Sequence, residues 1–265
     1  MKIRVLAWIT FLNLLRNRLI LLIVAVLICV VLLMMTPLIG AKAMSADSAQ
    51  TPGMIPMLVS GIMSLVSGFG SLLAAWSAAD AVASEMKSGT ILAVMARPVR
   101  RWEFLLGKYL GVMMLMGIYV AFMYAVSSIL AWIGGERVVT NPWVLLVYPM
   151  VRYGIYAAAA TWLVAVMHPV FAFALVLIAA VLASLAGPNS NGLGFLPGGL
   201  RRGLFLVLPS TNLLDETNFL ALTSEHLKAV PWTQHVTALA YGLDCSVVFF
   251  LFAAWAFRRR GLSRE

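Results

Sequence analysis

The sequence has little charge, and this scarcity limits the class of protein more than any motif does. Asp, Glu, Lys and Arg make up 11% of its 265 residues, whereas 62% are hydrophobic. A water-soluble domain of this size carries about a quarter charged residues, so something other than water must solvate the excess apolar surface. A lipid bilayer is the simple answer, and the composition predicts an integral membrane protein.

Residues that support chemistry are also scarce. The two cysteines, Cys29 and Cys245, lie inside apolar runs, and we interpret them as small core residues, not as a disulfide framework. The three histidines form no H-E-x-x-H pair, which argues against a zinc site. A rhomboid-like nucleophile at Ser67 would have glycine two residues earlier, where Leu65 stands. We therefore expect neither an enzyme nor a metal site in this chain.

The net charge of +9 raises the question of nucleic acid. The basic residues, however, lie at the ends of apolar runs and do not gather on one face. Lysines and arginines in that position are typical of proteins that contact a membrane surface. We expect membrane lipids as partners, and no nucleic acid.

Six segments are long and apolar enough to cross a bilayer core about 30 Å thick, which requires about 20 helical residues. The predicted fold is therefore an all-α integral membrane protein in a single domain, residues 1–265. The predicted spans are residues 19–36, 57–81, 104–132, 146–167, 169–187 and 236–257. The first is interpreted as a retained anchor, because Thr36-Pro37 follows it instead of a cleavage site.

The distribution of basic residues predicts the orientation. With both termini in the cytoplasm, and with Lys108 at the inner end of the third span counted as inner, the inner segments hold 13 Lys and Arg and the outer segments hold 5. Inner segments of membrane proteins are enriched in these residues. We therefore expect a multi-pass protein of the plasma (inner) membrane with both termini cytoplasmic.

Two segments outside the spans have a distinct pattern. Residues 3–18 have apolar side chains at helical spacing and polar ones elsewhere around the turn, which predicts a helix in the cytoplasmic interface or a simple extension of the first span. Residues 188–235 form the largest extracytoplasmic segment. Its apolar stretch 203–209 is too short to cross, and we expect it to dip into the outer leaflet or to pack on the span ends.

A charged, proline-containing stretch, "SEMKSGTILAVMARPVRRWEFLLGKYLG", lies between the second and third spans. Ser88 is suited to cap a short helix that ends before Pro98. This helix would present apolar side chains to the cytoplasm, which suits docking onto a soluble protein. The alternative is a solvated loop whose arginines only enforce the topology.

The order of residues in this stretch resembles the membrane subunits of ABC-2-type transporters. In that family an acidic residue, a Gly-Thr pair, a Pro and an R..F..GK run occupy the loop between the second and third spans. Here they correspond to Glu85, Gly89, Thr90, Leu92, Pro98, Arg101, Phe104, Gly107 and Lys108. The layout of the remaining chain is similar as well.

The resemblance implies a permease subunit that pairs with a second permease subunit, in a homodimer or a heterodimer, and with two copies of an ABC ATP-binding subunit. Residues 84–103 would form the coupling loop, with Glu85, Gly89, Thr90, Leu92, Pro98 and Arg101 acting toward the ATPase. The chain contains no phosphate loop, because Gly107-Lys108 lacks the upstream glycine and the following Ser or Thr. The partner subunit would bind ATP and Mg²⁺, and no cofactor is expected in this chain. No charged cavity can be assembled from the spans, which favours export of an apolar or amphipathic substrate.

An ATP-independent secondary transporter or channel is the alternative function. Such proteins mark their pathway with ionisable residues at mid-membrane, and this sequence has Arg152 and Asp244 at similar predicted depths. A lone charge in hydrocarbon is costly and is usually paired. We therefore predict an ion pair between Arg152 and Asp244, within one subunit or across a dimer; independent contacts with the outer interface are the alternative.

Small residues mark expected helix contacts. Ser60, Ser64 and Gly68 recur every four residues in the second span, and Gly107 and Gly111 do so in the third. This spacing lets membrane helices approach closely. The contacts could lie within one subunit or at a dimer interface.

The predicted topology can be tested by cysteine labelling. In a variant without Cys29 and Cys245, single cysteines near Asp47 and Asn191 should react with a membrane-impermeant reagent on intact cells. A cysteine near Lys87 should react only after permeabilisation. The reverse pattern would overturn the orientation.

Overall fold

The computed structural model describes residues 2–45, 54–87, 101–134, 142–185, 209, 211–214 and 232–259. Every regular element in these ranges is a helix. The helices are α1 (Lys2–Leu15), α2 (Arg18–Ser45), α3 (Met54–Lys87), α5 (Arg101–Gly134), α6 (Pro142–Val164), α7 (Pro169–Leu185), the short 3-10 helix η1 (Thr211–Leu214) and α9 (Trp232–Arg259).

Five helices in the described ranges are long and apolar enough to cross a membrane, namely α2, α3, α5, α6 and α9. They correspond to the first four predicted spans and to the sixth. The predicted span 169–187 corresponds to α7, which has 17 residues in the described part. At 1.5 Å per residue α7 is about 26 Å long, slightly less than the hydrocarbon core of a bilayer. The structure therefore confirms a multi-spanning helical protein, while the total of six spans stays a prediction.

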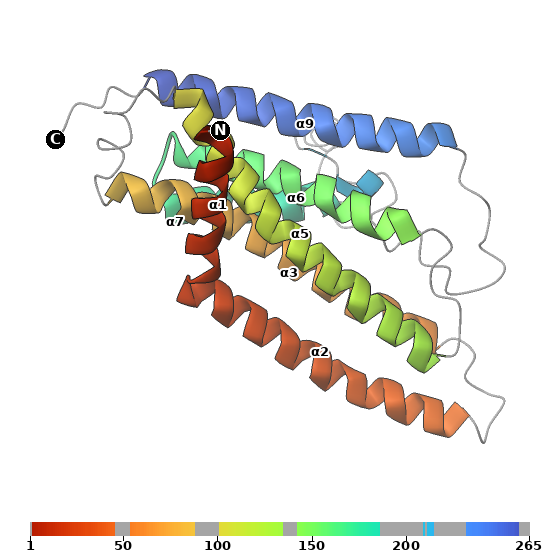
Figure 1. Ribbon diagram of the computed structural model, residues 1–265. Helices are drawn as coiled ribbons and strands as arrows, with labels where there is room; N and C mark the ends of the chain where they lie inside the picture. The colour runs from red at the N-terminus through yellow and green to blue at the C-terminus, as the bar shows by residue number, and fades with distance from the viewer. Residues whose placement is uncertain are drawn as a thin grey trace.

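The long helices run side by side with alternating direction (Figure 1). α1, in red, crosses them at the end of the bundle where α3 and α9 end and α5 begins. By the distribution of basic residues this is the predicted cytoplasmic end, and we call it the inner end.

The helices beside the charged stretch extend further than predicted. α3 continues to Lys87 and α5 begins at Arg101, so residues 84–87 and 101–103 of the predicted loop are helical. The predicted spans stopped at the first charged residues, because hydropathy cannot distinguish a polar loop from a helix that continues beyond the lipid.

α1 packs along the start of α5. A side chain at Gly107 would meet Leu6, and one at Gly111 would come within 2.8 Å of the Ala7 carbonyl oxygen and 2.7 Å of Thr10 Cβ. These two glycines were predicted to be helix contacts. Their partner is the helix that crosses the bundle, not another span.

The outward face of α1 is apolar, contrary to the predicted pattern. Val5, Trp8 and Leu12 are exposed there, at 58%, 52% and 39%. α1 therefore has apolar side chains both on the face buried against α5 and on the face turned outward. Exposed Trp and aliphatic side chains suit a helix that lies in the headgroup region of a membrane.

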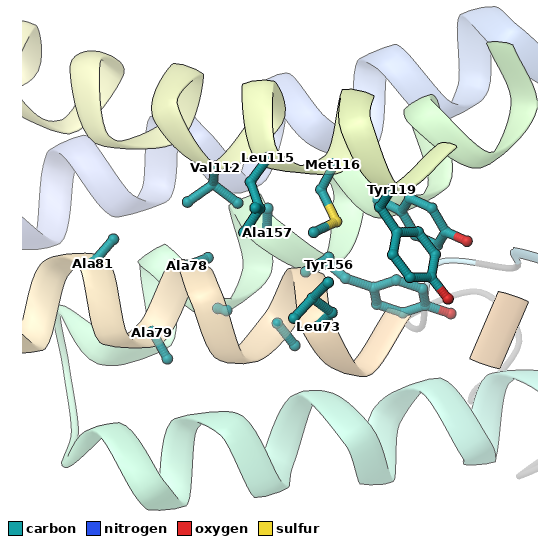
Figure 2. Close-up of a cluster of buried hydrophobic side chains, with 14 of the residues drawn as sticks. Leu73, Ala78, Ala79, Ala81, Val112, Leu115, Met116, Tyr119, Tyr156 and Ala157 are labelled. Atoms are coloured by element: carbon teal, nitrogen blue, oxygen red, sulfur yellow. The ribbon is translucent and has the colours of Figure 1, made fainter. Parts of the chain in front are cut away.

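The core is centred on α3, α5 and α6 (Figure 2). α3 carries small residues on more than one side, including Ala74, Ala75, Ala78, Ala79 and Ala83, all fully or nearly fully buried. Larger side chains from α5, such as Leu115 and Met116, lie over the side of α3 toward which Ala81 points. Small residues let the α3 backbone approach its neighbours closely.

The start of α2 is tied to α3 by one asparagine. The Asn17 side-chain oxygen accepts the Leu19 N–H at 3.0 Å, which caps α2. Its side-chain amide donates to Asp80 Oδ2 at 2.6 Å. The corner between α1 and α2 is therefore fixed to the inner half of α3.

Part of the predicted extracytoplasmic segment lies deep in the bundle. Leu214 of η1 is fully buried and lies beside Gly242 of α9. The Thr211 and Tyr156 hydroxyls are 3.0 Å apart. Gly242 is ten residues from the start of α9, or about 15 Å along the helix. The segment thus re-enters the bundle at Thr211–Leu214, whereas residues 203–208 of the predicted dip lie outside the described ranges.

Aromatic side chains mark both ends of the bundle. Near the outer end, Trp143, Trp232 and His235 pack together, and the Tyr148 hydroxyl lies 2.7 Å from His235 Nδ1. Near the inner end, Trp255 is exposed on α9, and the guanidinium carbon of Arg259 lies 4.0 Å from the centroid of its ring. Tryptophans gather at the two interfaces of a membrane. Trp232 and Trp255 therefore bracket the part of α9 that crosses the lipid.

The second predicted set of small residues has no contact with the other helices in the described part of the chain. Ser64 and Gly68 are exposed on α3, and nothing lies within 4 Å of a side chain placed at Gly68; the side chain of Ser60 lies outside the described part. Cys29 is also exposed, on α2, so its interpretation as a core residue was wrong.

Gly70 is required because two tyrosine rings occupy the space beside it. A side chain there would meet Tyr119 and Tyr153. Tyr119 donates its hydroxyl hydrogen to the Val66 carbonyl, and Tyr153 donates to the Ser67 carbonyl at 3.5 Å. These bonds hold both rings against α3.

We expect Gly70→Ala to destabilise the protein by about 1–3 kcal/mol, the usual effect of overpacking a core. Gly68→Ala is the matched control on the same helix, since the space beside Gly68 is open and alanine favours helix. Thermal unfolding in detergent should give a lower midpoint for Gly70→Ala alone. Equal midpoints would show that the tyrosines move aside.

Candidate functional site

The predicted coupling residues fall on two helix ends and on a segment outside the described ranges. Glu85 lies in the last turn of α3, and Arg101 is the first residue of α5. Gly89, Thr90, Leu92 and Pro98 lie outside the described residues, so their predicted role stays a prediction. The site is therefore described from the two helix ends that flank residues 88–100, the end of α3 and the start of α5.

The two helix ends are joined by a buried ion pair. Lys108, two turns into α5, is 2% exposed, and its Nζ donates to Glu85 Oε1. The same Nζ lies 5.6 Å from the centroid of the Phe104 ring. Removing one partner of a buried ion pair leaves the other charge uncompensated, which costs about 3–5 kcal/mol. The ends of α3 and α5 are thus held at a fixed separation.

Arg101 contacts the end of another helix. Its Nη1 donates to the Phe257 carbonyl and to the Arg258 carbonyl, at 3.3 Å each. These carbonyls belong to the last turn of α9, where a helix lacks N–H partners of its own. One turn along α5, Phe104 stacks on Phe257 with ring centroids 6.0 Å apart. The start of α5 is therefore fastened to the end of α9 as well as to α3.

These contacts form a cluster at the inner end that we call the inner clamp. Its members are Glu85 of α3, Arg101, Phe104 and Lys108 of α5, and Phe257 of α9. The α5 residues recur at helical spacing, so one stripe of α5 serves both neighbours. On the adjacent face of the same turns, Gly107 and Gly111 receive α1. Three helices, α1, α3 and α9, thus converge on the start of α5.

The predicted pair of Arg152 and Asp244 is not formed within the chain. Gly242 of α9 lies beside Val151 of α6, so the two charges are at similar levels, as expected. Because Gly242 faces α6, Asp244 lies about 200° further around α9 and is exposed. Arg152 is 8% exposed, and its guanidinium carbon lies 5.7 Å from the Tyr153 ring centroid. Contact between the two charges across a dimer stays a prediction.

An apolar pocket lies between α6, α7 and α9. Both α7 and α9 pack on α6 but scarcely contact each other, which leaves a cavity of about 340 Å³. It is lined by Tyr156, Ala159 and Trp162 of α6, by one face of α7, by Phe249 of α9 and by Pro209. Apolar pockets of this size take small apolar molecules or chains.

The sequence interpretation missed two features of this site. Lys108 was counted as an inner basic residue and as part of the resemblance but not paired with Glu85, although the two carry opposite charges at neighbouring span ends. The bonds from Arg101 to α9 had no signal in the sequence, because the acceptors are backbone carbonyls. Among the described residues, no three His, Cys, Asp or Glu side chains gather in a metal-binding group.

Comparison with known proteins gives the family. No curated protein matches the chain. A family model described as "ABC-2 family transporter protein" matches residues 4–262, nearly the whole sequence. The match extends from α1 through the last turn of α9, so it includes every residue of the inner clamp. This chain therefore belongs to the ABC-2 family of transporter proteins and is a multi-pass membrane permease, the transport component and not a catalytic one.

Proposed function

We propose that this chain is the membrane half of an ATP-driven exporter and that residues 88–100 receive a separate ABC ATP-binding subunit. The observation that carries the proposal is the inner clamp. Residues 88–100 connect Lys87 of α3 to Arg101 of α5, and the two helices that flank them are joined by the ion pair of Glu85 and Lys108. A force on this segment would reach α3 and α5 together.

The proposed complex contains two copies of the ATP-binding subunit and a second permease subunit, identical or different, in the inner membrane with both termini cytoplasmic. Support for a second permease comes from a face of α3 that none of the described residues covers. Gly61, Ser64 and Gly68 are exposed there, and a side chain at Gly61 or Gly68 would touch nothing within 4 Å. Small residues on an unoccupied face suit close packing with another membrane helix.

We further propose an apolar or amphipathic cargo. Support comes from the pocket between α6, α7 and α9, whose lining side chains are apolar except for the Tyr156 hydroxyl and the Trp162 indole N–H. The Tyr156 hydroxyl is already bonded to Thr211. The pocket therefore offers dispersion contacts and apolar burial, and no charged partner to a polar solute.

The coupling role can be tested with Glu85→Ala and Arg101→Ala in the complex with its ATPase. We expect ATP-driven transport in proteoliposomes to fall about tenfold or more, within the range of coupling free energies between sites. Size-exclusion profiles should show that the variants still fold. The purified chain alone should hydrolyse no ATP.

Arg16→Ala is the control for that experiment, because Arg16 is an exposed basic residue at the inner end and lies outside the clamp. It should transport normally. Normal transport by both clamp variants would contradict the coupling role.

The cargo proposal can be tested with a fluorescent fatty acid, dansyl-undecanoic acid, titrated into the detergent-solubilised protein. Ala159→Phe places a ring in the pocket and should weaken binding about tenfold, equivalent to ~1.4 kcal/mol. Ala121→Phe is the matched control, because Ala121 is exposed on α5 away from the pocket. Equal affinities in the two variants would show that the pocket is not the binding site.

A further inference from the structure

Directly after the coupling segment, Arg101 and Phe104 at the start of α5 contact the end of α9. Arg101 follows directly after residues 88–100, and its guanidinium is bonded to the Phe257 and Arg258 carbonyls 3.3 Å away. Phe104 stacks on Phe257 beside it. Further along, Tyr109 packs on Phe250 and is hydrogen-bonded to Ser246 of α9. In the described part of the chain, Arg101 and Phe104 thus make the contacts between α5 and α9 that lie nearest to residues 88–100.

The chemistry of this link favours a strong attachment. The end of a helix carries a partial negative charge, and a cation there is stabilised by it. Carbonyls of the last turn have no intrahelical donor, so the Arg101 hydrogen bonds replace bonds to water, not bonds within α9. A planar guanidinium presents several donors in a fixed geometry, so it can serve two adjacent carbonyls, which an ammonium group does less well.

The position of α9 makes the attachment consequential. α9 packs most extensively on α6, and Phe249 of α9 lines the apolar pocket while stacking on Trp162 of α6 at 5.9 Å. Phe249 is eight residues before Phe257, or about 12 Å along the same helix. A shift of the α9 end would therefore change the wall of the pocket.

We infer that Arg101 is a positioning residue through which movement of the coupling segment is passed to α9 and so to the pocket. The inference rests on the proposed function. It assigns to Arg101 a contact with this chain's own last helix, in place of the contact with the ATPase that the sequence resemblance implies. The ion pair of Glu85 and Lys108 joins α5 to α3, and the hydrogen bonds of Arg101 join α5 to α9.

The test follows the α9 end directly. A polarity-sensitive fluorophore is attached at Leu251→Cys, an exposed position on α9, in a variant with Cys29→Ser and Cys245→Ser. The complex with its ATPase is reconstituted in lipid nanodiscs, and the emission is recorded before and after ATP and Mg²⁺ are added. Retention of the ATPase on the purified permease is measured separately.

In Arg101→Gln we expect the ATPase to be retained and the ATP-dependent emission change to fall about fivefold or more, the lower end of typical coupling between sites. Arg101→Lys keeps the positive charge but not the planar set of guanidinium donors, and its emission change should fall less than that of Arg101→Gln. The same variant tests the inference if Arg101→Gln fails to fold. Arg259→Gln is the matched control. It removes one exposed positive charge from the same helix end without removing a bond to Phe257, and should respond like the parent.

The outcomes separate this inference from the proposed function. A full emission change in Arg101→Gln, or an equal loss in Arg259→Gln, would overturn the role of Arg101 and leave the proposed function standing. Loss of the ATPase from Arg101→Gln would show that Arg101 acts in docking, which also overturns the inference. Failure of the parent permease to retain any ATPase would overturn the proposed function, and the inference with it.

Discussion

Hydrocarbon cannot solvate an unpaired charge, and this constraint shapes the inner end of the protein. Lys108 is buried within a helix that continues into the membrane, so its ammonium group requires a partner inside the protein. Glu85 supplies that partner, and the bond fixes the separation between α3 and α5. Once this separation is fixed, the two helices form one support for residues 88–100. The electrostatic requirement of one lysine thus becomes a mechanical property of the permease.

The sequence predicted the helices well, because hydropathy depends only on local composition. The apolar runs gave five spans that the structure contains, and Gly107 and Gly111 were correctly expected at a helix contact. The predicted boundaries were wrong where helices outlast the lipid, as at Lys87 and Arg101. α7 shows the converse, since an apolar run alone does not fix how far a helix extends.

Contacts between helices were harder to predict, because they depend on the angular position of each residue and on backbone groups. Arg152 and Asp244 were expected at the same level, which the contact between Val151 and Gly242 supports. Only the packing of α9 on α6 shows that Asp244 faces outward. Likewise Arg101 could be recognised as part of a motif, but its carbonyl acceptors on α9 carry no identity in the sequence.

The tryptophans of α9 have a consequence for the surrounding membrane. Trp232 and Trp255 are twenty-three residues apart, which corresponds to about 35 Å along a straight helix. Each tryptophan prefers the headgroup region of its own leaflet, so their spacing sets the bilayer thickness that α9 matches without tilting. In a thinner bilayer α9 would have to tilt, and the tilt would act at Arg259, next to the carbonyls that Arg101 holds. Hydrophobic mismatch costs only fractions of a kcal/mol per ångström, but here it acts on the element joined to the coupling segment. We therefore expect acyl-chain length to affect the position of the α9 end.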